Sequence, residues 1–358
     1  MSNQHFQFKL FSTTHFLHLT IDSYRFGNLA MRLQNYFGAP EWFPRTAVAV
    51  YGMINNWKER ISHSINPLMA AHRIGLATGD IEFAMLSAAL HASCSIHAGR
   101  SLRDIAKENR EFHELMLLYK QTQMLSMLVP NMQVVLNFIG QARGNPWELS
   151  GNVMDEEVEL DRAASTKNGS VTTTIHLYQL YIAYYVHEYD AAFKAAKLLR
   201  AFKVDVVSSF GECTRYFLEG MTAIAIAHKS NKRRYRRLGR TNLKCLKKLQ
   251  LLGPENARNK VALMEAELEF LDGNVSVALG MYDKAIELSA KQGITQEHAL
   301  ATERKALAIL SIGQYSSGLQ LLRTAQSIYE DWGSNLKVER ISKDLFFRTQ
   351  EYQNASSV

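Results

Sequence analysis

Three side chains that can bind a metal ion lie close together in the sequence: His91, Cys94 and His97. Imidazole and thiolate are ligands that zinc prefers, and a structural zinc site needs four of them. On a helix the two histidines would lie about 120° apart around the axis, so they converge poorly on one ion. No fourth ligand is evident nearby. The alanine-rich sequence around them favours a closely packed helix with buried histidines and a buried cysteine.

Two further groups of ionisable residues fall short of a known chemical pattern. His187-Glu188 lacks the second histidine that a zinc protease carries four residues after the first, because Ala191 stands there. The acidic segment 155–161 lacks the alternating oxygen ligands and the central glycine of a calcium loop. The sequence therefore predicts no catalytic residue, no metal site and no cofactor, and a protein that is not an enzyme.

The most specific local feature is a basic run from Lys229 to Lys248, which holds ten basic residues and no acidic one. Such a run can bind an acidic protein, a phospholipid surface or nucleic acid, and residues 232–237 can also act as a nuclear-import signal. Tyr235 is its only aromatic residue, so base stacking has little support and nucleic acid is not favoured as a partner. The candidate residues for an anionic partner are Lys232, Arg233, Arg234, Arg236, Arg237 and Arg240.

A structural interpretation of the same run competes with the functional one. The run can be an inter-helix loop that continues into an amphipathic helix. Its lysines would then lie in solvent and its leucines would pack inward. The residues concerned are Lys244, Lys247 and Lys248 on one side and Leu243, Leu246 and Leu249 on the other.

The charge of the whole chain depends on this run. Lys plus Arg number 41 against 34 Asp plus Glu, which gives a net charge of +7 and a pI near 9.2. Without the ten basic residues of the run, 31 remain against the same 34 acidic residues. The high pI is therefore poor evidence for nucleic-acid binding.

Other features narrow the class of protein. The three cysteines are far apart in the sequence and form no C-x-x-C pair, which favours a reducing compartment. The N-terminus lacks the pattern of a signal peptide, and no uninterrupted apolar stretch is long enough to span a membrane. We expect a cytoplasmic protein without a membrane span.

Apolar residues recur three and four positions apart over most of the chain, and alternating strand patterns are nearly absent. Turn-like positions recur at steps of 44, 45, 43, 43, 43 and 40 residues, and they are Asn55, Gly99, Gly144, His187, Ser230, Gly273 and Gly313. This period fits a helix–turn–helix unit that buries its apolar faces against its neighbours. The sequence predicts an all-α, tetratricopeptide (TPR)-like α-solenoid of about seven antiparallel helix pairs over residues 1–345, and a flexible tail over 346–358.

The TPR-like pattern is most regular over about residues 258–333. Small residues stand where two helices would cross most closely, with one large residue in the gap. Around Gly273 these are Ala266, Ala278, Tyr282 and Ala285, and around Gly313 they are Ala306, Gly318, Leu322 and Ala325. In a TPR groove, Lys260, Glu267 and Glu303 occupy positions that often face the concave surface. There they would clamp the carboxylate or amine of a peptide.

Several segments carry a resemblance to a known family: Tyr24-Arg25-Phe26-Gly27, the segment from Gly75 to Ala84, and the segment from Tyr329 to Val338. The chain resembles the helical-repeat region of very large signalling proteins. In those proteins a kinase-like domain and an AAA-type ATPase precede TPR-like repeats, and GAF and histidine-kinase or cyclase modules follow. The resemblance extends from about residue 10 to about residue 345. It implies a helical-repeat fold and a protein partner such as an AAA-type ATPase or kinase module.

The catalytic motifs of that family are missing from the sequence. It contains no G-x-x-x-x-G-K-[ST] loop, no glycine-rich kinase loop, no H-R-D and no D-F-G. We therefore expect a non-enzymatic interaction or regulatory scaffold, either a fragment or a stand-alone relative of a signalling ATPase or sensor kinase. The alternative function is binding of an anionic partner through residues 229–248.

Overall fold

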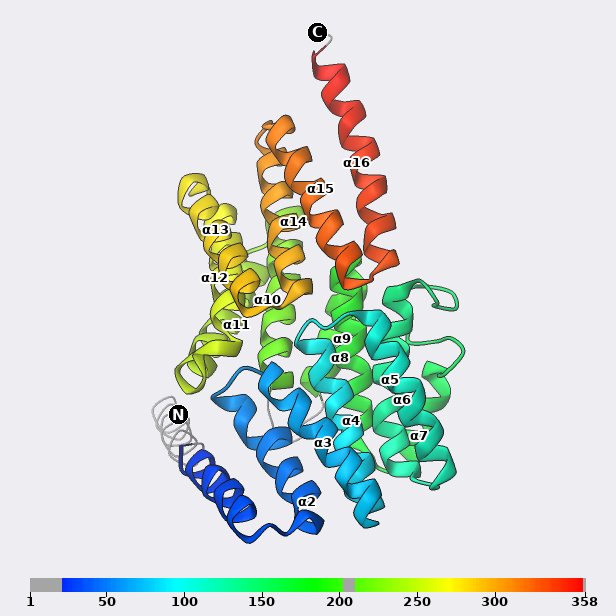
Figure 1. The fold of residues 1–358 in the computed structure, drawn as a ribbon. Coiled ribbons are helices and arrows are strands. Elements are labelled where there is room, and N and C mark those ends of the chain that lie inside the picture. The colour runs from blue at the N-terminus through cyan, green and yellow to red at the C-terminus, as the bar shows by residue number, and fades with distance from the viewer. Residues whose placement is uncertain (1–20, 202–209, 357–358) are drawn as a thin grey trace, which may run out of the picture.

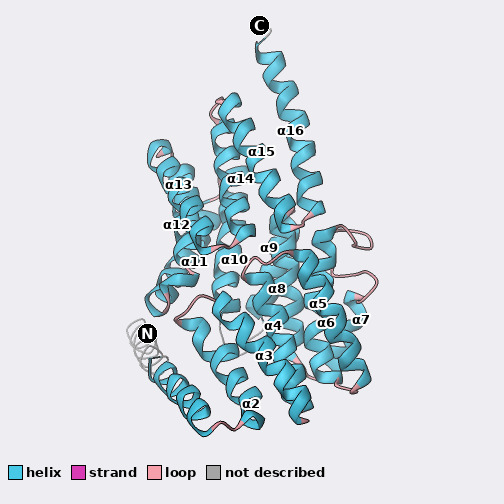
Figure 2. Cartoon of the chain, in the orientation of Figure 1, coloured by secondary structure: helices cyan, strands magenta, loops and turns pink. Residues whose placement is uncertain are grey.

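The computed structural model describes residues 21–201 and 210–356, and this part of the chain is helical with no strand (Figures 1 and 2). The predicted all-α class is confirmed. A helix over residues 21–37 comes first. Four short helical segments follow: η1 (Pro40–Trp42), α2 (Phe43–Ala47), η2 (Val48–Ile54) and η3 (Asn55–Trp57).

The remaining helices pack mainly as neighbouring pairs, which is the arrangement of an α-solenoid. The pairs are α3 (Ser62–Thr78) with α4 (Ile81–His97), α5 (Leu102–Leu118) with α6 (Thr122–Ile139), α8 (Gly169–Tyr185) with α9 (Tyr189–Ala201), α10 (Phe210–Ser230) with α11 (Arg233–Leu252), α12 (Arg258–Leu271) with α13 (Val275–Gln292), and α14 (Thr295–Ser311) with α15 (Tyr315–Trp332). The short α7 (Glu156–Ser165) packs on α8, η4 (Pro254–Asn256) precedes α12, and α16 (Asn335–Ser356) packs on α15.

The expected turns mark the pairs well only in the C-terminal half. His187, Gly273 and Gly313 each lie between the two helices of a pair and have positive φ angles of 63°, 88° and 81°. In the N-terminal half, Gly99 instead separates α4 from α5, and the turn within the first pair is at Gly79. The even spacing of turns therefore does not mark equivalent positions along the whole chain.

The C-terminal end of the chain differs from the expected tail. Helix α16 continues to Ser356, so residues 346–356 are helical, while residues 357–358 lie outside the described part. The helix is held where its side chains reach α15. Leu345 packs against the core, and the ring of Tyr352 stacks on that of Tyr315 with centroids 5.7 Å apart.

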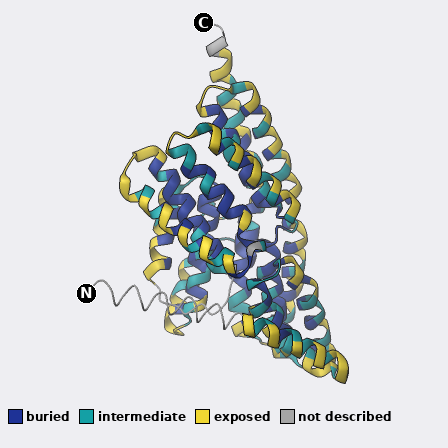
Figure 3. Ribbon diagram, turned by 90° about the vertical axis from the view of Figure 1, so that its left-hand side faces the viewer, coloured by how far each residue is buried: buried dark blue, intermediate teal, exposed yellow. Residues whose placement is uncertain are grey.

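The small residues expected at close helix crossings are buried. Ala278, Ala285 and Ala325 are fully covered, and Gly318 lies against α14. A Cβ atom at position 318 would come within 2.5 Å of Leu310 Cγ, so only glycine fits without a shift. Figure 3 shows the buried residues, in dark blue, running through the interior of the array.

The two ends of the array meet. Asn256 Nδ2 donates to Asn56 O at 2.9 Å, Gln296 Nε2 to His97 O at 3.1 Å, and Ser334 Oγ to Phe138 O at 3.1 Å. These partners are 200, 199 and 196 residues apart in sequence, so α12–α16 lie in register on the layer that contains α3–α6 (Figure 1).

Side chains fill the space where the two layers meet. The ring of Phe138 lies 5.0 Å from that of Trp332 and 5.6 Å from that of Tyr181, between centroids. The two layers thus meet through packed aromatic side chains. None of the helices in residues 21–201 and 210–356 combines the length and apolar character of a membrane span.

Candidate binding surface

Helix α11 carries most of the basic run and is amphipathic. Leu243 and Leu246 are buried against the array, and Gly239 lies at the crossing with α10. A Cβ atom at position 239 would lie 2.7 Å from Ile224 Cγ1, so glycine allows this close approach. The structure confirms that Lys244, Lys247 and Lys248 lie on the exposed side, as the structural interpretation expected.

The exposed side of α11 carries a row of cations, which we call the cationic stripe: Arg233, Arg237, Arg240, Lys244 and Lys248. Their spacing of three or four residues places them on one face of the helix. At 1.5 Å per residue, the stripe is about 22 Å long. All five residues are exposed.

Some of the predicted binding residues are engaged within the protein. Arg240 Nη2 lies 2.6 Å from Asp272 Oδ2, and Arg236 Nη1 lies 3.4 Å from Asp272 Oδ1, which ties α11 to the end of α12. Arg234 lies over the ring of Tyr235 at 4.5 Å. Its Nη2 also donates to the Tyr235 hydroxyl at 2.7 Å.

Two more cations of the run are engaged, because Lys247 Nζ lies 2.5 Å from Glu265 Oε1 and Lys229 lies 5.1 Å from the centre of the Tyr189 ring. The remaining five make no ion pair with the residues that the structure describes. Lys232, Arg233 and Arg237 are exposed and make no ion pair there, and the same holds for Lys244 and Lys248. The first turn of α11 contains no acidic residue. The helix dipole therefore adds positive potential to the end of the stripe at Arg233.

Helix α9 adjoins the beginning of α11. The rings of Phe193 and Tyr235 meet edge to face with centroids 5.4 Å apart. Helix α9 also exposes Lys194 and Lys197, which adds positive charge to this part of the surface. Because Phe193 and Arg234 occupy the ring of Tyr235, that ring is not presented for stacking on a nucleic-acid base.

The predicted peptide-groove residues do not face an open groove. Lys260 and Glu267 are buried, with 1% of each residue exposed. Lys260 Nζ lies 2.7 Å from Glu297 Oε1. Glu267 accepts two hydrogen bonds of 2.7 Å from Arg304 and one of 2.8 Å from the Tyr282 hydroxyl. The charges of Lys260 and Glu267 are thus neutralised by residues of α14, in the neighbouring pair.

Glu303 is buried in the same way. It accepts hydrogen bonds of 2.7 and 2.9 Å from Lys337 Nζ and one of 2.8 Å from the Tyr329 hydroxyl. His187 Nε2 lies 3.0 Å from Glu303 Oε1. Burial favours a higher pKa for Glu303, but the charges of Lys337 and His187 outweigh it and hold this pKa well below its usual value.

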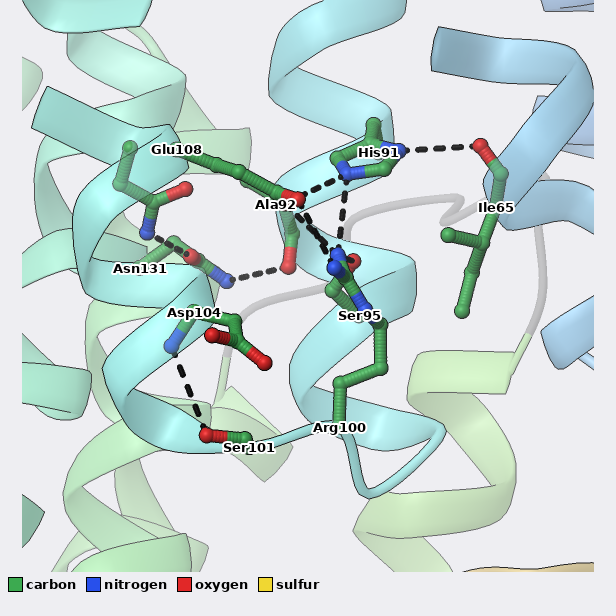
Figure 4. A network of polar contacts seen from close by, with 10 residues as sticks. Ile65, His91, Ala92, Ser95, Arg100, Ser101, Asp104, Glu108 and Asn131 are labelled. Atoms are coloured by element: carbon green, nitrogen blue, oxygen red, sulfur yellow. Dashed lines mark hydrogen bonds and ion pairs between the residues drawn. The ribbon is translucent and has the colours of Figure 1, made fainter. Parts of the chain in front are cut away.

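The histidines and cysteine near residue 94 are core residues. His91 joins α4 to α3 through Ile65 O at 3.0 Å and to α5 through Glu108 Oε2 at 2.9 Å (Figure 4). Burial favours a higher pKa for Glu108, but the contacts with Arg100 and His91 lower this pKa to about 2. Burial raises the pKa of Cys94 to about 12. The described residues contain no group of three or more His, Cys, Asp or Glu placed to hold a metal ion.

A pocket of about 190 Å³ lies beside Cys94, between helices that include α4, α8 and α10. Thr173, Glu212 and Arg215 are among its lining residues. Its charged groups bind each other, because Arg215 donates to Glu212 at 3.0 and 2.6 Å. Sequence reasoning did not identify this pocket, since its lining comes from segments more than a hundred residues apart.

No model of a protein family matches the sequence, and no curated protein matches it either. What the chain binds is therefore inferred from its own residues. Among the sites described above, the cationic stripe is the one whose charges are accessible and largely free of ion pairs.

Proposed function

We propose that this protein is a non-enzymatic interaction scaffold and that its cationic stripe binds an acidic segment of a partner protein. The observation that carries the proposal is the row of exposed α11 cations, four of which make no ion pair with the described residues: Arg233, Arg237, Lys244 and Lys248. The buried carboxylates support the non-enzymatic part, because Glu267, Glu297 and Glu303 are each neutralised by a cation.

The geometry of the stripe favours an acidic helix over the other anionic partners. Cations three or four residues apart are about 5–6 Å apart along a helix, which matches the spacing of carboxylates on an acidic helix. Single-stranded nucleic acid would need an aromatic ring, and the ring of Tyr235 is occupied. The resemblance to signalling proteins suggests an AAA-type ATPase or kinase module as the partner.

Electrostatics bounds the strength of this contact. An exposed ion pair contributes about 0.2–1 kcal/mol, so four or five pairs contribute about 1–5 kcal/mol at low salt. An affinity from these pairs alone is modest and falls as salt rises. Regions outside the stripe would supply further contacts in a tight complex.

The test is binding of a fluorescent glutamate-rich helical peptide, followed by anisotropy at low and high salt. The variant replaces Arg233, Arg237, Lys244 and Lys248 by Ser. We expect its affinity to fall about thirtyfold, which corresponds to about 2 kcal/mol for four exposed pairs.

A matched control removes the same charge elsewhere by replacing Arg73, Arg323, Lys284 and Lys291, all exposed, with Ser. This control should keep most of the affinity. Equal loss in both variants would mean that net charge acts rather than the stripe. Duplex DNA or phosphatidylserine vesicles are tested in the same way. If either binds more tightly than the peptide, and this binding depends on the stripe, then the partner is nucleic acid or a lipid surface and not an acidic protein.

A further inference from the structure

The helix over residues 21–37 has one packed side. Gly27 on this side is buried, and a Cβ atom at its position would lie 3.5 Å from Val50 Cγ2 of η2. The hydroxyl of Tyr24, also on this side, donates to Glu59 Oε1 at 2.5 Å. These contacts dock the helix on the array at its margin (Figure 1, dark blue).

The opposite side of this helix is apolar and exposed. It carries an apolar stripe of Phe26, Leu29, Leu33 and Tyr36, which are 69%, 49%, 46% and 82% exposed. Phe37 beside it is 71% exposed. The steps of three, four and three residues are those of a helix seam that packs against a second helix. An exposed, contiguous apolar row of this kind indicates an interface.

The order of the side chains is palindromic. An aromatic residue stands at each end of the stripe and a leucine at each inner position, and the steps read the same in both directions. We infer that two copies of this chain associate through the helix over residues 21–37, packed antiparallel about a twofold axis that passes between Leu29 and Leu33. Phe26 then faces Tyr36 of the second copy, and Leu29 faces Leu33 of the second copy.

The position of Arg25 beside the stripe and the exposed area of the stripe are both consistent with this arrangement. The same twofold axis brings Arg25 beside Phe37 of the second copy, where a guanidinium and a ring attract each other. With about 200 Å² for each large side chain, the stripe and Phe37 expose about 600 Å² per copy. Two copies would bury about 1,200 Å², the lower end for a specific interface.

This inference does not depend on the function proposed for α11, because the two surfaces lie on different helices. Sedimentation equilibrium of the full chain tests it. We expect a reversible dimer with a micromolar dissociation constant. The variant Leu29→Glu/Leu33→Glu should weaken association at least a hundredfold without loss of helical circular dichroism. The control Leu251→Glu/Val277→Glu, at exposed apolar positions elsewhere, should remain dimeric.

Disulfide crosslinking tests the antiparallel arrangement. Leu29→Cys and Leu33→Cys are made separately, and oxidation should crosslink their mixture far more than either variant alone. Efficient crosslinking of Leu29→Cys by itself would indicate a parallel arrangement and overturn the inference.

Three other results would also overturn it. The first is a full chain that stays monomeric at high micromolar concentration. The second is dimerisation only after removal of residues 1–20, which would mean that the chain covers its own stripe. The third is a monomer whose stripe binds phosphatidylcholine vesicles, because a lipid surface would then be the occupant.

Discussion

The buried ion pair between Glu303 and Lys337 gives a quantitative test of the interior described above. Lys337 Nζ donates to both carboxylate oxygens of Glu303 at 2.7 and 2.9 Å and to Tyr185 O at 2.7 Å. Both side chains are almost fully buried, at 0% and 1% exposed. Lys337→Met keeps the apolar stem and removes the charge, so Glu303 is left in the interior without its strongest partner.

We expect Lys337→Met to lower the free energy of unfolding by about 3–5 kcal/mol, the usual effect of removing one partner from a buried pair. The double variant Glu303→Leu/Lys337→Met should lose much less, because neither charge remains to be buried. The loss in the single variant should shrink at acid pH, since protonation of Glu303 removes the isolated charge.

Urea unfolding followed by circular dichroism and by tryptophan fluorescence measures these changes, and Trp332 is buried near Tyr329. Arg348→Met on the same helix is the control, because its ion pair with Glu351 is exposed and should contribute less than about 1 kcal/mol. A loss below about 1 kcal/mol in Lys337→Met, or additive losses in the double variant, would refute the reasoning.

Three further predictions concern other parts of the interior. Burial outweighs two nearby arginines and raises the pKa of Glu219 from 4.5 to about 7. The contribution of Glu219 to stability is therefore present below pH 4.5 and is lost as the pH rises through 7. Glu219→Gln should remove this loss, which amounts to about 3 kcal/mol in the free energy of unfolding. Burial lowers the pKa of His97 to about 4, so NMR should show this ring neutral down to about pH 5, and titration near 6.5 would contradict its burial. Gly253→Ala should lower the free energy of unfolding in urea by more than about 3 kcal/mol, because its Cβ would lie 1.8 Å from Trp57 O. Gly280→Ala should raise it by up to about 1 kcal/mol, because no atom lies within 4 Å of the added Cβ.

The helices could be predicted from the sequence because their signals are local. The three-and-four spacing of apolar residues and the turns at Gly273 and Gly313 lie within single pairs. The amphipathic nature of α11 was predictable for the same reason, since Leu243 and Leu246 alternate with its lysines. The exposed cations of the basic run were therefore found from sequence.

The contact between the two layers could not be predicted, because it depends on residues about 200 positions apart. Asn256 and Gln296 are ordinary polar residues in the sequence, and each becomes an inter-layer hydrogen-bond donor only in the fold. The positions of Lys260 and Glu267 were misjudged for this reason. One signal could have helped: each has an opposite charge 37 residues later, close to one repeat length, at Glu297 and Arg304.

The contacts that join the two layers also bear on how the protein folds. In an open repeat array, stability is a sum over neighbouring units, and end units can fray one at a time. Here the bonds of Asn256, Gln296 and Ser334 tie the C-terminal helix pairs to the layer that contains α3–α6. Loss of a pair in one layer therefore also removes support from the other layer. We expect unfolding in one cooperative step, and folding slower than in open arrays, because the chain must first close loops of about 200 residues.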